Sequence, residues 1–412
     1  MKVAIVHDYI KEYGGAERVL ESLHSVFPNA PIYTSIYLPS YLGPHRSRFE
    51  NWDIKTSWAQ NLPFKAKLIS PIRLIAPNLF GSFDFSKFDA VIVSATGAYS
   101  PNTIKKRNAV QICYFHTPPR YLYGYETARD WKKNIITRII GNLSIHFLRM
   151  VDFNSSQNVD YFIANSNETK RRIEKFYRKD AVVIYPPVSL ASSKLASSVQ
   201  LKDQKLNATS LDARRYYLAG GRMARAKHTD LIVQTFIRNG LPLKIFGKGF
   251  AGFESELKQI ILRANERESR SKGKFSTRRV PDGNPSSSNN NIEFLGEITD
   301  EEKDKLMAGA KAFVFASEDE DFGIVPVEAM MSGTPVIAHR SGGVLETVVE
   351  GKTGIFFDEF SVESLNNAIK RFETLRRAQS MFDSAKIKQH AQKFSKERFE
   401  KEVKEFVESK LK

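Results

Sequence analysis

Two carboxylates stand eight residues apart in the segment from Glu320 to Met330, with a Phe-Gly pair between them. The segment directly follows Lys311 to Ala316, an apolar run typical of a buried strand. A strand that leads through an acidic loop into a helix presents polar groups at the edge where open α/β sheets bind ligands. At this edge Glu320 and Glu328 can accept hydrogen bonds from vicinal hydroxyls, as an acidic residue does with a ribose.

A second strand-to-helix junction carries positive charge. Gly220-Gly221 is followed by Arg222 and Lys227, just before a helical pattern that begins near Thr229. The glycines let backbone approach a ligand, and the two cations can face a diphosphate at the same edge of the sheet. Cations for a diphosphate and carboxylates for hydroxyls together describe a sugar-nucleotide site. The alternative is that both loops are merely solvated and that Glu328 serves the helix start.

Three further loops add candidate groups. Ser341, Gly342 and Gly343 lie between a strand and a helix, where successive amides could hold phosphate oxygens, although Gly-Gly is also ordinary turn chemistry. Gly14-Gly15 opens the first helical pattern of the chain. His116 follows the apolar run Val110 to Phe115, so it could hydrogen-bond a sugar hydroxyl or serve a structural role.

Two series of alternating strands and helices position these loops, and such alternation predicts parallel sheets in an α/β protein. We expect one domain over residues 1–195 and a second over 213–390, because Ser189 to Asp212 has no apolar periodicity. Residues 265–290 are almost devoid of apolar side chains and are predicted to be a mobile insertion. Residues 391–412 form an amphipathic pattern through Phe399, Val403 and Phe406, for which we expect packing across the domain interface.

The composition is that of a folded protein. The 412 residues are 42% hydrophobic and 26% charged, and no run of about 18 uncharged apolar residues predicts a membrane span. The start of the chain does not resemble a signal peptide, and Cys113 is the only cysteine, which suggests a reducing, cytoplasmic setting. We expect Cys113 to be a small buried residue.

The net charge of +16 is concentrated in part of the chain. Residues 101–150 contain 9 basic and 2 acidic residues. Among them Arg120, Tyr121, Lys132 and Lys133 belong to a basic, aromatic-bearing stretch that could lie on an anionic membrane surface. Solvated helix faces are the alternative. A nucleic-acid-binding protein is a competing hypothesis from a different class, but no recognition motif for nucleic acid accompanies the charge.

The motifs taken together resemble those of retaining glycosyltransferases of family 4. The resemblance covers most of the chain and is most specific in its C-terminal half, through Arg222 and Lys227, the two glutamates eight residues apart and Ser341-Gly342-Gly343. It implies the GT-B fold, two Rossmann-like domains that face each other across a cleft. His116 with Thr117-Pro118 and the Glu320 to Glu328 segment resemble a subgroup of bacterial O-antigen and capsule mannosyltransferases, which implies GDP-mannose as donor.

The resemblance also implies roles for single residues. Arg222 and Lys227 would neutralise the departing diphosphate, Glu328 would bind the ribose, and Glu320 would bind hydroxyls of the transferred sugar. His116 would act near the anomeric centre. The backbone of the segment from Phe322 through Gly323 and Ile324 to Val325 would assist, Gly14 and Gly15 would approach the phosphate or acceptor, and Ser341 to Gly343 would lie near the base and phosphates.

The expected activity is therefore hexosyl transfer with retention, from GDP-mannose to a lipid-linked or oligosaccharide acceptor in the synthesis of a cell-surface polysaccharide. A UDP-sugar-dependent enzyme of the same fold is the alternative, and a dinucleotide oxidoreductase lacks its glycine motif after the first strand. No cofactor or metal is expected, because the histidines are scattered and Arg222 and Lys227 can take the place of a cation. We expect a cytoplasmic protein, peripheral on the inner face of the cell membrane.

Overall fold

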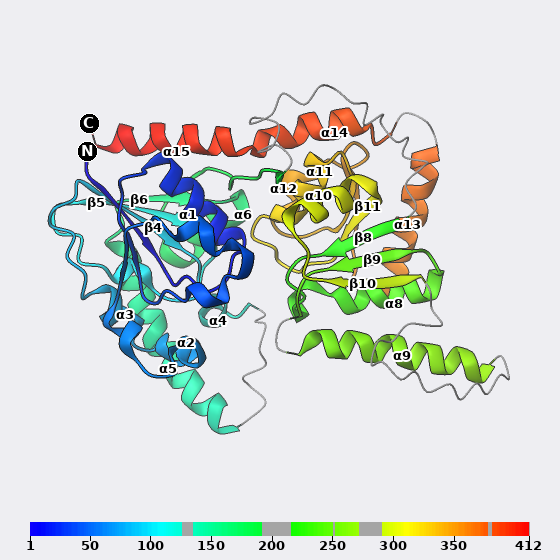
Figure 1. Ribbon diagram of the computed structural model, residues 1–412, viewed down its shortest axis with the longest axis horizontal. Coiled ribbons are helices and arrows are strands. Elements are labelled where there is room, and N and C mark those ends of the chain that lie inside the picture. Colours follow the sequence, from blue (N-terminus) through cyan, green and yellow to red (C-terminus); the bar gives the residue numbers. More distant parts are fainter. Residues whose placement is uncertain (126–134, 192–215, 250–251, 272–290, 378–380, 412) are drawn as a thin grey trace. The chain divides into compact units, whose positions relative to one another are not determined.

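The computed structural model describes residues 1–125, 135–191, 216–249, 252–271, 291–377 and 381–411. It divides into two compact units (Figure 1). The first comprises Met1–Pro187 together with Phe394–Lys412, and the second comprises Val188–Lys393. The division precedes the expected domain boundary, whose limits of 195 and 213 fall in a stretch outside the described residues.

A parallel sheet of seven strands forms the centre of the first unit, in the order β3-β2-β1-β4-β5-β6-β7. This order reverses direction beside β1, which places the ends of β1 and β4 at the point where doubly wound sheets bind ligands. The strands are β1 (Val3–His7), β2 (Ile32–Thr34), β3 (Ile54–Thr56), β4 (Ala90–Ala95), β5 (Val110–Phe115), β6 (Tyr161–Ala164) and β7 (Ala181–Val183).

Helices cover both faces of this sheet, because its central strands are buried on both sides and need apolar cover. Cys113 lies within one of these two apolar layers, and burial raises the pKa of its thiol, as expected for a structural residue. The α-helices of this unit are α1 (Gly15–Val26), α2 (Lys65–Ile72), α3 (Ala76–Phe80), α4 (Arg120–Tyr123), α5 (Ile135–Gln157), α6 (Asn167–Tyr177) and α15 (Lys396–Lys410).

The C-terminal helix α15 completes the core of the first unit. It lies along α1 (Figure 1) and buries Phe399, Val403 and Val407 fully in the apolar layer that contains Leu20 and Leu23. Phe406, expected on the buried side, is only partly buried. Val407 takes the inward position because it follows Val403 by one helical turn.

The second unit is built on a parallel sheet of six strands in the order β10-β9-β8-β11-β12-β13. Its strands are β8 (Tyr216–Gly220), β9 (Leu243–Phe246), β10 (Ile292–Gly296), β11 (Ala310–Phe315), β12 (Val336–His339) and β13 (Gly354–Phe357). Its α-helices are α8 (Thr229–Asn239), α9 (Phe253–Ser271), α10 (Asp300–Gly309), α11 (Ile324–Met331), α12 (Val344–Thr347), α13 (Val362–Arg377) and α14 (Ser384–Ala391).

The predicted start of the insertion, at residue 265, lies too early in the sequence. Helix α9 continues to Ser271, so residues 265–271 are helical, and residues 272–290 lie outside the described part of the chain. Strong helix formers such as Arg and Glu sustain the helix there although apolar side chains are few. Apolar content alone therefore placed the start of the insertion several residues before the helix ends.

Candidate active site

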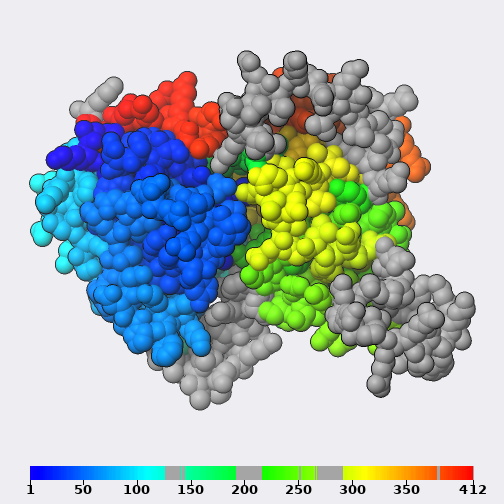
Figure 2. Space-filling view, viewed as in Figure 1, coloured from blue at the N-terminus to red at the C-terminus, as the bar shows by residue number. Residues whose placement is uncertain are grey.

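Four loops meet at one edge of the sheet in the second unit. They follow the neighbouring strands β9, β8, β11 and β12, and parallel strands bring their carboxyl ends to the same edge. Three of these loops carry the predicted cations, the first predicted carboxylate and the Ser-Gly-Gly turn. In the space-filling view, the yellow residues that follow β10 form part of the visible surface of this unit (Figure 2).

Glu320 lies at the centre of this edge. Its Oε2 accepts hydrogen bonds from the Lys227 ammonium group and from Ser317 Oγ, the latter at 2.7 Å. The ion pair is only partly exposed, with side-chain exposures of 32% for Lys227 and 18% for Glu320. The Lys227 ammonium group also lies 5.5 Å from the centre of the Phe315 ring. The structure thus brings together a predicted cation and a predicted carboxylate that are 93 residues apart in the chain.

The loop that carries the cations is held by its own backbone. Met223 N donates to Lys248 O at 3.1 Å on one side, and Glu318 N donates to Ala226 O at 3.0 Å on the other. Gly221 has a φ of +109°, a value that favours glycine. Arg222 is exposed beside this fixed backbone. Lys227 is therefore positioned by a loop with fixed backbone contacts, and Arg222 belongs to the same loop.

The Gly342-Gly343 turn packs against the acidic loop. A Cβ added to Gly342 would lie 2.3 Å from Glu320 O, and one added to Gly343 would lie 2.4 Å from Asp321 O. Gly343 N already donates to Glu320 O at 2.7 Å. The glycines are needed here because two backbones touch. Their role near the base and phosphates stays a prediction, and Ser341 Oγ lies 2.9 Å from His339 Nδ1.

Helix α11 begins at the Phe-Gly pair. Phe322 is 2% exposed and anchors the turn, and Gly323 has a φ of +87° at the N-cap position. Because the N-cap residue has no side chain, it supplies no oxygen to the first amides of the helix. The amides of Ile324 and Val325 stand in this first turn, where a helix favours negative charge.

Glu328 is 2% exposed, far more buried than a solvated loop residue. Its Oε1 accepts a hydrogen bond of 2.8 Å from Lys303 Nζ, which also donates to Asp300 Oδ1 at 3.0 Å. The pair links α10 to α11. Lys303 escaped the sequence interpretation because it lies among acidic residues on a charged helix, where a solvated face is the ordinary reading.

Two histidines and a phenylalanine form an aromatic stack at the same edge, which the sequence interpretation also missed. Phe360 lies between His228, at 4.3 Å between ring centres, and His339, at 3.7 Å. Burial lowers the pKa of His339, so this ring is uncharged at neutral pH. His228 Nε2 lies 3.4 Å from Glu318 Oε2.

In the first unit His116 stands directly after β5. Its Nε2 lies 2.9 Å from Ser94 Oγ, and Ser94 Oγ in turn lies 3.1 Å from His7 Nδ1. Although part of the residue reaches solvent, desolvation lowers the pKa of His116 to about 3, with His7 as a smaller cause. His116 is thus a neutral hydrogen-bonding group at neutral pH and not a cation.

Gly14 and Gly15 stand where expected, at the start of α1. The amide of Gly14 already donates to Glu17 Oε2 at 2.9 Å, as part of a capping box. The Glu17 carboxylate therefore occupies a place at this helix start that an anion would otherwise favour. The role of Gly14 and Gly15 in approaching phosphate or acceptor stays a prediction.

The basic surface stretch is only partly described. Arg120 begins α4, and the Tyr121 ring receives the Arg73 guanidinium group 4.2 Å from its centre. Lys132 and Lys133 lie outside the described residues. Within the described ranges, no helix is long and apolar enough to cross a membrane.

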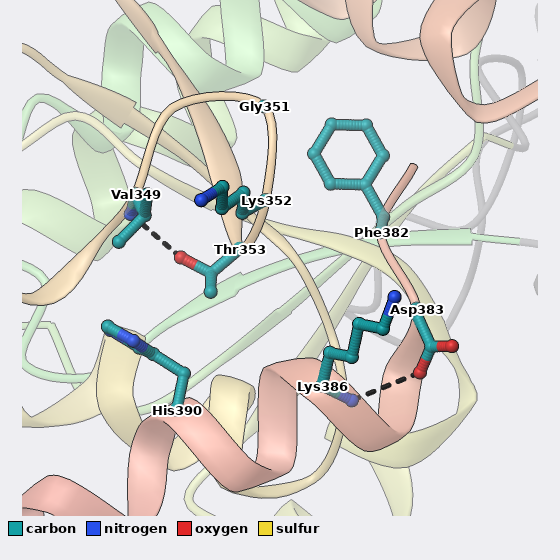
Figure 3. Close-up of a pocket in the computed structure, with 8 residues that line it drawn as sticks. All are labelled: Val349, Gly351, Lys352, Thr353, Phe382, Asp383, Lys386 and His390. Carbon is teal, nitrogen blue, oxygen red and sulfur yellow. Dashed lines mark hydrogen bonds between the residues drawn. The ribbon is translucent and has the colours of Figure 1, made fainter. Parts of the chain in front are cut away.

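A pocket of about 350 Å³ opens elsewhere in the second unit (Figure 3). It lies between α14 and the loop that precedes β13, hence at the amino end of that strand and not at the edge of Glu320. Its lining includes Lys352, Lys386 and His390, and none of the predicted site residues. In the described part of the chain no group of three or more His, Cys, Asp or Glu side chains could hold a metal ion.

Comparisons with known proteins agree with this fold. Residues 13–192 match the family model for Glycosyltransferase Family 4, and residues 287–389 match that for Glycosyl transferases group 1. The crystal structure of Anabaena HepE in complex with UDP and glucose superposes with a TM-score of 0.64 at 17% identity, covering 99% of this chain and 100% of that one. Residues 13–192 and 287–389 thus match glycosyltransferase family 4 and group 1 domains, and the chain has the GT-B fold.

Several curated relatives are named as mannosyltransferases. The chain is 26% identical over 401 residues to the alpha-1,3/1,6-mannosyltransferase ALG2 of Dictyostelium discoideum, covering 90% of this chain and 89% of that protein. It is 28% identical over 291 residues to ALG2 of Kluyveromyces lactis. That second match spans 66% of this chain and about half, 54%, of the relative.

Proposed function

We propose that this glycosyltransferase moves mannose, with retention, from GDP-mannose to a glycan acceptor that is an oligosaccharide or is linked to a lipid diphosphate. The observation that carries the proposal is the contact between Lys227 and Glu320 at the carboxyl edge of the sheet, a cation and a carboxylate side by side. The choice of mannose rests on relatives named as mannosyltransferases.

The ion pair suggests how a donor would enter. The diphosphate of a sugar nucleotide carries more negative charge than one carboxylate, so it competes for the Lys227 ammonium group. Glu320 can then accept hydrogen bonds from hydroxyls of the sugar, while Ser317 Oγ still donates to one of its oxygens. Exposed Arg222 adds a second cation from the same loop.

The leaving diphosphate carries the chemical step. As the bond between the anomeric carbon and the diphosphate oxygen breaks, negative charge grows on that oxygen, and Lys227 and Arg222 stabilise it. The acceptor hydroxyl attacks from the same face, and its proton passes to the departing diphosphate. No second carboxylate is needed on the opposite face, unlike in a retaining glycosidase. Neutral His116 is a hydrogen-bonding group for a sugar hydroxyl and carries no net charge.

The reaction proposed here is independent of metal. Transfer in the presence of a chelator should equal transfer without it, because two side-chain cations take the place of a metal ion. Loss of turnover with the chelator, restored by Mn²⁺, would overturn this part of the proposal.

A donor panel tests the substrate. Purified protein is incubated with GDP-mannose, UDP-glucose or UDP-N-acetylglucosamine, and release of nucleoside diphosphate is measured with and without an acceptor glycan. The proposal expects release from GDP-mannose alone. Release from a UDP-sugar alone would replace it with the UDP-sugar-dependent alternative, and the ALG2-type relatives would then be a poor guide to the donor.

The acceptor side is proposed from charge. A basic stretch that includes Arg120 and Tyr121 suits an anionic membrane that presents a lipid-linked acceptor of a polysaccharide such as O-antigen or capsule. This would make the protein peripheral on the cytoplasmic face of the membrane. Flotation with liposomes that contain anionic lipid, compared with neutral liposomes, tests it: equal failure to float with both contradicts membrane binding.

A further inference from the structure

Three polar side chains form a continuous line at the carboxyl edge of the sheet in the first unit. His7 ends β1, Ser94 lies near the end of β4, and His116 directly follows β5. These strands are neighbours, and the register pairs His7 with Ser94. The topology of the sheet therefore places His7 and Ser94 side by side, and the hydrogen bond from His116 N to Ala95 O holds His116 beside them.

Ser94, the middle residue of this line, has a single hydroxyl proton to donate in a hydrogen bond. Ser94 Oγ lies 3.1 Å from His7 Nδ1 and 2.9 Å from His116 Nε2, and both His7 and Ser94 are fully buried. A hydroxyl donates one hydrogen bond and accepts others. If Ser94 donates to His7, then His116 must donate to Ser94; if Ser94 donates to His116, then His7 must donate to Ser94.

Glu17 decides between the two directions. Its Oε1 lies 3.7 Å from His7 Nε2, a buried nitrogen that makes no hydrogen bond, and its Oε2 is held by Gly14 N. A nitrogen with a proton is attracted to the carboxylate, and a nitrogen with a lone pair is repelled by it. The favoured place for a proton on the His7 ring is therefore Nε2.

In the His7 tautomer with its proton on Nε2, Nδ1 is an acceptor. Ser94 then donates to His7, and the Ser94 oxygen accepts from His116 Nε2.

We propose that Glu17, His7 and Ser94 are positioning residues that hold His116 in the tautomer with its proton on Nε2. The other ring nitrogen of His116, Nδ1, is then an acceptor for a hydroxyl of a bound sugar. This role rests on the proposed function. The acceptor state of Nδ1 is needed before a sugar hydroxyl can donate to it, whereas a ring in the opposite tautomer would donate to the hydroxyl oxygen.

Nitrogen NMR of the histidine rings tests the proposal directly. In ¹⁵N-labelled protein at neutral pH, with His116→Gln to assign the signals, His116 should show a protonated Nε2 and an unprotonated Nδ1. A protonated Nδ1 in the unaltered protein overturns the proposal. This measurement needs no substrate, so it tests the proposed tautomer of His116 even if no donor is turned over.

Ser94→Ala should release the ring. Without the hydroxyl, His116 loses its preference for one tautomer, and kcat with GDP-mannose falls about tenfold or more while KM stays within about twofold. Ser94→Thr keeps a hydroxyl and should restore both. Ser155→Ala, which removes another buried serine hydroxyl from the same unit, should change neither.

The outcomes separate the two proposals. If the tautomer of His116 and kcat are both unchanged in Ser94→Ala, the positioning role of Ser94 is overturned and the proposed function still stands. Absence of turnover with GDP-mannose in the unaltered protein refutes the proposed function. The NMR signals of His116 in Ser94→Ala then test the positioning role of Ser94 without any measurement of activity.

Discussion

Lys227 and Glu320 form the residue pair on which the donor site depends. Without substrate the Lys227 ammonium group and the Glu320 carboxylate form an ion pair with each other. The pair is partly exposed, so a ligand can displace either partner. A cation that is paired but accessible suits a group that must bind a diphosphate and then release it. Glu328 has the opposite character, because it is buried and held by Lys303.

Lys227→Ala should reduce kcat by about 100-fold with a smaller change in KM, because its charge is needed most when the diphosphate leaves. Initial rates with GDP-mannose measure this. Arg225→Ala is the matched control: this cation stands in the same loop but pairs with Glu256, so its loss should leave the rate within about twofold. Equal rates for Lys227→Ala and the unaltered protein would refute the site.

Glu328→Ala should affect both binding and folding. It removes the predicted ribose contact and leaves the buried Lys303 without one of its two carboxylates, at a cost of about 3 kcal/mol in the free energy of unfolding. Calorimetric binding of GDP and urea denaturation measure the two effects. Lys303→Met removes the same ion pair but keeps Glu328, so weaker GDP binding in Glu328→Ala than in Lys303→Met indicates a direct contact. Equal GDP affinity in the two variants contradicts it.

His116 makes stability depend on pH. Its pKa is about 3 in the folded protein, well below the ordinary value, so between these values the unfolded chain binds a proton that the folded chain does not. This contribution to stability is fully present above the ordinary histidine pKa and is lost as the pH falls through that value toward 3. The free energy of unfolding at pH 7 minus that at pH 5 should be smaller in His116→Gln. An unchanged difference would show that His116 titrates normally.

At the scale of elements, the acidic loop and the Ser-Gly-Gly loop form one unit. Gly342 and Gly343 are separated from Glu320 by more than twenty residues, yet their backbones touch it. Two loops after neighbouring strands thus hold the carboxylate in place, which is why glycine is required at both positions.

Gly342→Ala should disturb the site through packing. The new Cβ would lie 2.3 Å from Glu320 O, so the acidic loop must move, at a cost of about 1 to 3 kcal/mol and at least about a tenfold loss of kcat. Gly240→Ala is a close control, since its φ of +69° resembles the +64° of Gly342 but nothing lies within 4 Å. It should cost only about 1 kcal/mol and keep full activity. Equal effects on stability and rate in the two variants would assign the loss to backbone strain alone.

At the scale of the whole molecule, the last helix returns to the first unit. The chain leaves that unit at Pro187 and re-enters it at Phe394, so two segments far apart in sequence share one core. The apolar side of α15 covers α1 and contributes three fully buried residues. Stability of the first unit therefore depends on the far end of the chain.

Phe399→Ala should lower the free energy of unfolding by about 3 to 5 kcal/mol, because it empties a fully buried position beside Tyr114, 5.6 Å away between ring centres. Lys401→Ala on the exposed side of the same helix should change it by less than about 0.5 kcal/mol. Denaturation in urea measures both. A loss below about 1 kcal/mol for Phe399→Ala would mean that α15 adds little to the core.

The sequence by itself determined the two α/β series and the charges that each loop carries. The strand Val110–Phe115, for example, agrees with its expected limits, because local periodicity specifies it. The three-residue strands β2 and β3 went unnoticed, since runs that short carry no periodic signal. The expected family and fold were confirmed by the family models and the solved structure.

Only the tertiary structure decided which charges meet. It paired Lys227 with Glu320 and buried Glu328 against Lys303, a partner that no local pattern distinguishes from a solvated lysine. It also joined His7, Ser94 and His116, which lie on or directly after three strands that become neighbours only in the sheet. The physical reason is the same in each case: periodicity reports the environment along one element, and contacts between elements depend on strand order and on side-chain packing.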